Sequence, residues 1–138
     1  MHRTRRFFQF AIALWLLSLV LPAVYTGKFL YGIECLVFSL LYTLLVFVDS
    51  SANPIAISSL LGTIANGLML ASSIVVYYQH KPKAIYMRSA GWAMIILPFC
   101  ALTLLGNGAM ISPTVGALVW YSSLVMAGIH NIAYRQDI

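Results

Sequence analysis

Charged side chains are scarce in this sequence. Only 8% of its 138 residues are Asp, Glu, Lys or Arg, and only three of those are acidic. A water-soluble domain carries about a quarter of its residues charged, because its surface must be solvated. The deficit excludes an ordinary soluble domain. With 62% hydrophobic residues, the chain is expected to be surrounded mainly by lipid.

Cysteine, histidine and acidic residues are few and are not grouped. Cys35 and Cys100 both lie inside apolar runs, which is typical of buried free thiols and not of a disulfide framework. The His and Cys residues lack the close spacing of a zinc site. Paired catalytic carboxylates, a nucleophile elbow, a P-loop and a dinucleotide-binding glycine motif are also missing. We therefore expect no catalytic residues, no metal and no cofactor, and predict that the protein is not an enzyme.

The basic residues give a net charge of +5 without forming one continuous stretch. They gather at the N-terminus and again around Lys81, Lys83 and Arg88. Short basic clusters beside apolar runs are typical of membrane topology and of contact with anionic headgroups. Nucleic-acid binding would need one continuous basic face. The predicted partner is a lipid bilayer and not nucleic acid.

Long apolar runs take the place of the missing charge. Each has about 17 to 25 residues, enough to span about 30 Å of hydrocarbon as a helix. A membrane β-barrel would show shorter segments of alternating polarity. The prediction is an all-α, polytopic transmembrane helical bundle in a single domain, with about five spanning helices and four as the second choice. The expected helices are 7–24, 32–48, 54–78, 84–105 and 113–134.

Three of these helices have informative beginnings. Asn53 is expected to cap the third helix, with Pro54 at its first position. Ser112 and Pro113 repeat this pattern before the last helix. The first run follows a basic start as a secretory signal does, but it is long for one and has no A-x-A site after it. We expect it to be a retained helix.

Positive charge does not settle the orientation if all five segments cross. One face would carry three N-terminal arginines, and the other would carry Lys28, Lys81, Lys83, Arg88 and Arg135. The count favours the second face as cytoplasmic, whereas the usual dominance of the first helix favours the first face. A half-spanning segment would remove the conflict. The expected candidate is 54–78, because of its Ser, Gly and Asn content.

Small or polar residues recur at every fourth position of the third segment, as Ser59, Thr63, Gly67 and Ala71. Small residues at this spacing let two helix backbones approach closely, which favours association in lipid. Asn66 lies beside them, and an amide at mid-membrane depth needs a partner. This helix-packing seam predicts contacts within one bundle or, alternatively, a homo-oligomer interface or pore lining.

Glu34 opens the second segment beside Cys35. If five segments alternate, His130 and Arg88 lie near the same face. Glu34 can then extend to the headgroups or pair with one of these cations. We identify Glu34, His130 and Arg88 as a candidate polar site within the membrane or at its interface. Intramembrane ionisable groups often serve ion or proton handling.

Four short motifs are spread along the chain: "SLVLPA" (18–23), "GIECL" (32–36), "ANP" (52–54) and "GALVWYSS" (116–123). Together they resemble a family of small uncharacterised bacterial multi-span membrane proteins. Its members similarly show Leu-Pro-Ala ending the first helix, Gly-x-Glu-Cys-Leu opening the second, Asn-Pro opening the third and Gly-x-x-x-Trp-x-x-Ser in the last. One departure is that Ser50 and Ser51 stand where an aromatic residue is expected. The resemblance implies a bacterial inner-membrane protein and brings no activity with it.

These patterns predict a small integral membrane protein of accessory, regulatory or immunity type. It would act through helix–helix contacts with a membrane-protein partner. One alternative is a homo-oligomeric pore or holin-like effector that uses the seam of the third helix. Another is a small proton- or ion-coupled transporter that uses Glu34 with His130 or Arg88. The expected location is the inner (plasma) membrane, crossed several times.

Overall fold

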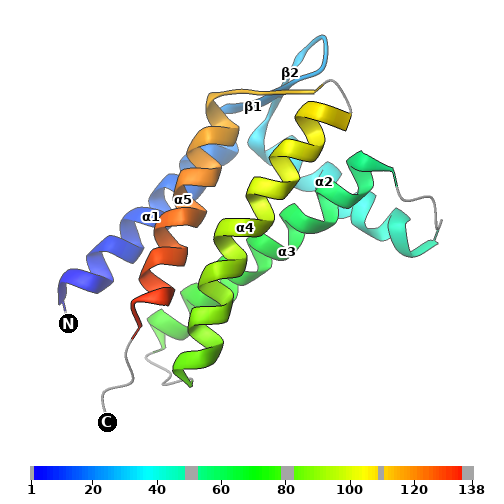
Figure 1. Cartoon of the computed structure of the whole chain (residues 1–138). Helices are drawn as coiled ribbons and strands as arrows, with labels where there is room; N and C mark the ends of the chain where they lie inside the picture. The colour runs from blue at the N-terminus through cyan, green and yellow to red at the C-terminus, as the bar shows by residue number, and fades with distance from the viewer. Residues whose placement is uncertain (1, 49–52, 79–82, 109–110, 135–138) are drawn as a thin grey trace.

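The computed structural model describes residues 2–48, 53–78, 83–108 and 111–134. Within them the chain is mainly helical, as predicted, and contains five helices (Figure 1). They are α1 (His2–Val20), α2 (Gly32–Val48), α3 (Pro54–Tyr77), α4 (Ala84–Gly108) and α5 (Val115–Ile132). Three of them, α3, α4 and α5, are long and apolar enough to cross a membrane.

The fold is not purely helical, because a small antiparallel sheet closes one end. Its strands are β1 (Pro22–Tyr25), β2 (Phe29–Tyr31) and β3 (Ser112–Pro113), in the order β2-β1-β3. Pro22 disfavours helical geometry at the preceding residue and cannot donate to a helix. The backbone after Val20 therefore pairs with other strands, and the prediction that the first helix reaches residue 24 is wrong.

The same sheet changes the start of the last helix. Ser112 and Pro113 pair with β1, and Thr114 takes the N-cap position, donating its backbone N–H to the carbonyl of Ala23 at 2.8 Å. The expected Ser-Pro start at residue 113 is therefore wrong. The cap predicted for the third helix is confirmed: the side-chain oxygen of Asn53 accepts the backbone N–H of Ala56 at 2.7 Å.

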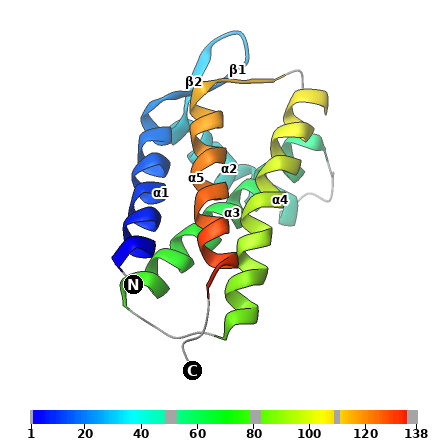
Figure 2. The same cartoon turned by 60° about the vertical axis from the view of Figure 1, so that its left-hand side comes forward.

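Four helices run along the length of the molecule, with α1 beside α5, α5 beside α4 and α4 beside α3 (Figure 2). Their core contains many small residues, which allow the backbones to lie close together. It is formed by Phe8, Ala11, Ala65, Met69, Met94, Leu124 and Ala127. Helices α4 and α5 approach closely at Gly91 and Gly128, where an added Cβ on either residue would collide with the other's carbonyl oxygen.

Helix α2 is the irregular element. It starts beside the β1–β2 hairpin and runs obliquely across α3 (Figure 1), and none of its residues is buried. The half-spanning segment was expected in 54–78, but α3 is a continuous helix of 24 residues. With 17 residues, α2 reaches only about 25 Å at 1.5 Å per residue.

This course places the basic residues differently from a chain in which five segments alternate. Because α2 and α3 together return the chain once, α4 begins at the same end as α1 (Figure 2). Arg3, Arg5 and Arg6 of α1 lie at that end with Lys83 and Arg88. The described residues contain six Lys or Arg side chains, and the remaining one, Lys28, lies in the hairpin at the other end. The expectation that the 25–31 loop and the start of the fourth helix share a face is wrong.

Candidate functional site

Glu34 lies in the first turn of α2, at the hairpin end of the molecule. Its carboxylate accepts the backbone N–H of Tyr31 at 2.8 Å, and the side chain is exposed. A negative charge at a helix N-terminus is favoured by the free N–H groups and the helix dipole. This contact joins the end of β2 to the first turn of α2, so Glu34 has a structural role at this junction.

His130 and Arg88 lie near the opposite end. The ring of His130 packs against Phe8 of α1, with centroids 4.9 Å apart, and its Nδ1 lies 3.4 Å from Oδ1 of Asn131. The hairpin end of α5 is marked by Gly116, which lies against the backbone of Pro22 in β1. The 14 residues from Gly116 to His130 cover about 21 Å along a helix. The predicted grouping of Glu34 with His130 and Arg88 is therefore wrong.

The seam of α3 is divided between two environments. Thr63 lies 2.9 Å from the hydroxyl of Ser39 and 3.1 Å from that of Thr43, and Ser39 also donates to the backbone carbonyl of Ser59 at 2.8 Å. These contacts join α3 to α2 at their crossing. Beyond the crossing α2 diverges, so Gly67 and Ala71 are exposed, and no atom lies within 4 Å of a Cβ added at Gly67.

Asn66 joins three helices. Its side-chain oxygen accepts the indole N–H of Trp15 of α1 at 2.8 Å and that of Trp120 of α5 at 2.9 Å. Both donors are thereby satisfied in an apolar interior, where an unpaired N–H is costly. This arrangement makes Asn66 a structural hub and leaves its carbonyl occupied.

A second polar group lies deeper toward the basic end and was missed by sequence reasoning. Asn131 is fully buried and donates its amide to the hydroxyl of Ser72 at 2.8 Å and to the sulfur of Met94 at 3.6 Å. The signal in the sequence is a pair of polar residues inside apolar runs, Asn131 in α5 and Ser72 in α3, each of which needs a hydrogen-bond partner. Its contacts lock α3, α4 and α5 together.

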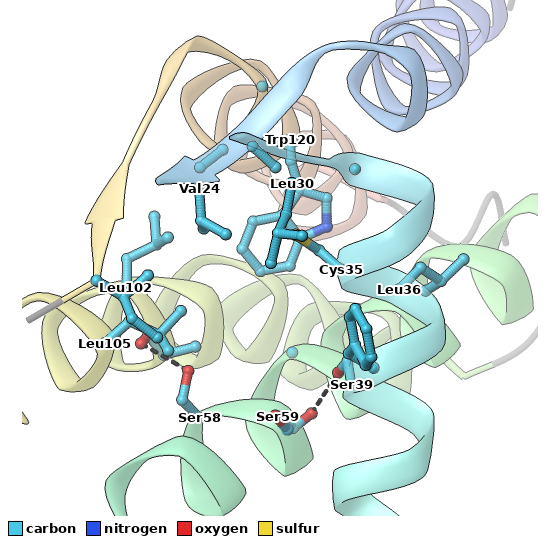
Figure 3. A pocket seen from close by; sticks show the side chains of 18 of the residues that line it. Val24, Leu30, Cys35, Leu36, Ser39, Ser58, Ser59, Leu102, Leu105 and Trp120 are labelled. Atoms are coloured by element: carbon cyan, nitrogen blue, oxygen red, sulfur yellow. Dashed lines mark hydrogen bonds between the residues drawn. The ribbon is translucent and has the colours of Figure 1, made fainter. Parts of the chain in front are cut away.

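The largest feature missed from the sequence is a partly open cavity of about 350 Å³ at the hairpin end (Figure 3). All five helices and the β1–β2 hairpin contribute to it. Its floor is α3, its walls are α2 and α4, and the hairpin, the end of α1 and Trp120 of α5 complete the lining. Typical lining residues are Val24, Leu30, Cys35, Ser58, Leu102 and Trp120. Among the described residues, none that lines it is charged.

Metal binding finds no support in the part of the chain that the structure describes, where no three His, Cys, Asp or Glu side chains form a group that could hold an ion. Cys35 lines the cavity and Cys100 does not, and both are free thiols. The arrangement is therefore an apolar cavity above a set of satisfied polar contacts between helices.

Comparisons with protein-family models, with curated proteins and with solved structures find no match for this chain. The fold itself defines the class. It is a mainly helical protein with three helices of membrane-spanning length and hydropathy, a fourth helix beside them, an oblique α2 and a small sheet at one end.

Proposed function

We propose that the protein is a non-enzymatic, multi-pass protein of the bacterial inner membrane that acts as an accessory subunit through helix contacts with a membrane-protein partner. In this proposal α1, α3, α4 and α5 cross the bilayer, and α2 lies obliquely in one leaflet. Four crossings agree with the second choice from the sequence. With four crossings, the start of α1 and the end of α5 lie on the side of the membrane that carries most of the basic residues. The positive-inside rule assigns this side to the cytoplasm.

The sidedness can be measured with single cysteines in a background carrying Cys35→Ala and Cys100→Ala. An impermeant maleimide applied to intact cells is expected to label Lys28→Cys and to label Lys83→Cys only after the membrane is permeabilised. The two positions lie at opposite ends of the molecule. Five full crossings would place them on the same side, so equal labelling in intact cells would contradict the four-crossing proposal.

One observation carries the accessory role: the exposed, open strip of small residues on α3 beyond its crossing with α2. Gly67 and Ala71 occupy this strip between exposed apolar residues, of which Ile64 is 42% and Ile74 is 55% exposed. A helix from another protein can approach such a strip closely, which is the main means of recognition inside lipid. The alternatives have less support. A polar pore lining would need Ser59, Thr63 and Asn66, but the Thr63 hydroxyl and the Asn66 side-chain oxygen are engaged within the chain. A carrier would need Glu34 near His130 or Arg88, which lie near the opposite end of the molecule.

The accessory role is tested by gentle extraction of the tagged protein and measurement of its native mass. The wild-type chain is expected to be found with a second, different protein. Gly67→Leu should reduce that protein at least about tenfold, because the side chain blocks close backbone approach. Gly106→Leu is the matched control, since Gly106 of α4 is also exposed and has no atom within 4 Å of an added Cβ. A homo-oligomer of defined number, with no other protein, would instead favour the pore.

A further inference from the structure

The cavity at the hairpin end has the chemistry of a site for hydrocarbon. Several of its polar side chains are engaged: Ser58 donates to the carbonyl of Ala101 at 2.8 Å and Ser39 donates to that of Ser59 (Figure 3). The Trp120 indole donates to Asn66. The remaining lining is mostly aliphatic or aromatic. A charged ligand would lose its hydration there without gaining a partner of opposite charge, whereas an apolar ligand loses nothing.

The dimensions of the cavity match one leaflet of a bilayer. The residues of α3 that line it run from Ile55 to Asn66, and 11 steps of 1.5 Å give about 16 Å along the helix axis. The hydrocarbon core of a bilayer is about 30 Å thick, so each leaflet supplies about half of that. A chain that enters from the hairpin end would therefore lie alongside α3 as far as Asn66.

The cavity also has a lateral mouth. Helices α2 and α4 form opposite walls but make almost no direct contact. Phe38 and Tyr42, one turn apart on α2, line the cavity and are also exposed, with Phe38 at 46%. The opening therefore faces the outside of the bundle at a depth where, in the proposed orientation, the surrounding medium is lipid.

We propose that this cavity binds one hydrocarbon chain of a bilayer phospholipid, which enters between α2 and α4 and keeps its headgroup at the level of the hairpin. An apolar lining exposed to water would lose the favourable free energy of its burial, and in the proposed orientation a lipid chain is the apolar molecule at the mouth. Lys28, exposed in the hairpin turn, provides a positive charge at the headgroup level. The inference rests on the membrane location in the proposed function but not on any protein partner.

The test begins with protein reconstituted into vesicles of phosphatidylethanolamine and phosphatidylglycerol and then released for native mass spectrometry. One phospholipid per wild-type chain is expected to remain bound. Gly62→Leu should reduce this at least about tenfold, since its side chain takes the space of several lipid methylenes. An added Cβ at Gly62 meets only Ser39 Oγ at 3.8 Å and Trp120 at 3.9 Å, so the helix tolerates it and the rest extends into the cavity. Gly106→Leu should retain the lipid.

A second measurement on the wild-type chain does not depend on whether a variant folds. A phospholipid with a diazirine in its acyl chain is expected to cross-link to Cys35, Leu36 or Leu102, and excess unlabelled phospholipid should remove these cross-links. Cross-links spread evenly over the exposed residues of α2, such as Val37 and Leu41, would overturn the proposal, as would wild-type protein with no retained lipid. Full lipid retention by Gly62→Leu would also overturn it. Because neither readout involves a protein partner, failure of the accessory role alone would leave both results unchanged.

Discussion

Replacing Gly128 with leucine is expected to disrupt the packing of α4 against α5. A Cβ added at Gly128 would lie 2.7 Å from the carbonyl oxygen of Gly91, and one added at Gly91 would lie 2.6 Å from that of Gly128. Both obstacles are backbone atoms, so no side chain can rotate away and the helices themselves must separate. Overpacking a core typically costs about 1–3 kcal/mol, and more where the backbone must move. We expect the free energy of unfolding to fall by about 3 kcal/mol or more.

The measurement is reversible unfolding in mixed micelles with increasing sodium dodecyl sulfate, followed by circular dichroism. Gly106→Leu is the matched control, because it makes the same change on α4 at an exposed position with no neighbouring atom within 4 Å. Its effect should stay within about 0.5 kcal/mol, as is usual for surface changes. If Gly128→Leu unfolds at the same detergent fraction as the control, α4 and α5 do not approach as closely as their contact at Gly91 indicates.

The helices were predictable because they rest on local information. Solid apolar runs of membrane length form helices wherever they are placed in lipid, since only intrahelical bonds satisfy the backbone there. The Asn53 cap depends on residues three apart and is equally local. The sheet is different. β1 pairs with Ser112 and Pro113, almost ninety positions away in the sequence. The periodicity of neither segment indicates a partner at that distance.

The polar site was mispredicted for one physical reason, which is the course of α2. An apolar run of 17 residues has the same composition whether it crosses a bilayer or lies obliquely in one leaflet. The sequence prediction assumed that every run crosses the membrane. If one run does not cross, every later segment lies on the opposite side from the one predicted. That single change separates Glu34 from His130 and Arg88. The cavity was missed for a related reason, since all five helices and the hairpin form its lining and only their tertiary arrangement creates the space.

Asn66→Leu is the substitution within α3 for which we expect the largest loss of stability. The leucine keeps a similar volume but cannot accept the indole N–H groups of Trp15 and Trp120, which now bind the amide oxygen at 2.8 and 2.9 Å. Hydrogen bonds between membrane helices contribute on average only about 0.6 kcal/mol. Here, however, two part-buried donors lose their only acceptor, at about 1–3 kcal/mol each. We expect the free energy of unfolding to fall by about 2 kcal/mol or more in the same detergent titration.

The origin of that loss can be separated from a general packing defect by removing the donors as well. In a chain that already carries Trp15→Phe and Trp120→Phe, Asn66→Leu should cost at least about 1 kcal/mol less than it does in the wild-type chain. The difference arises because no indole N–H is then left unpaired. Equal costs in the two backgrounds would show that the two hydrogen bonds contribute nothing beyond the shape of the side chain. A smaller cost would establish Asn66 as the acceptor that holds α1 and α5 against α3, directly beneath the cavity to which both Asn66 and Trp120 contribute.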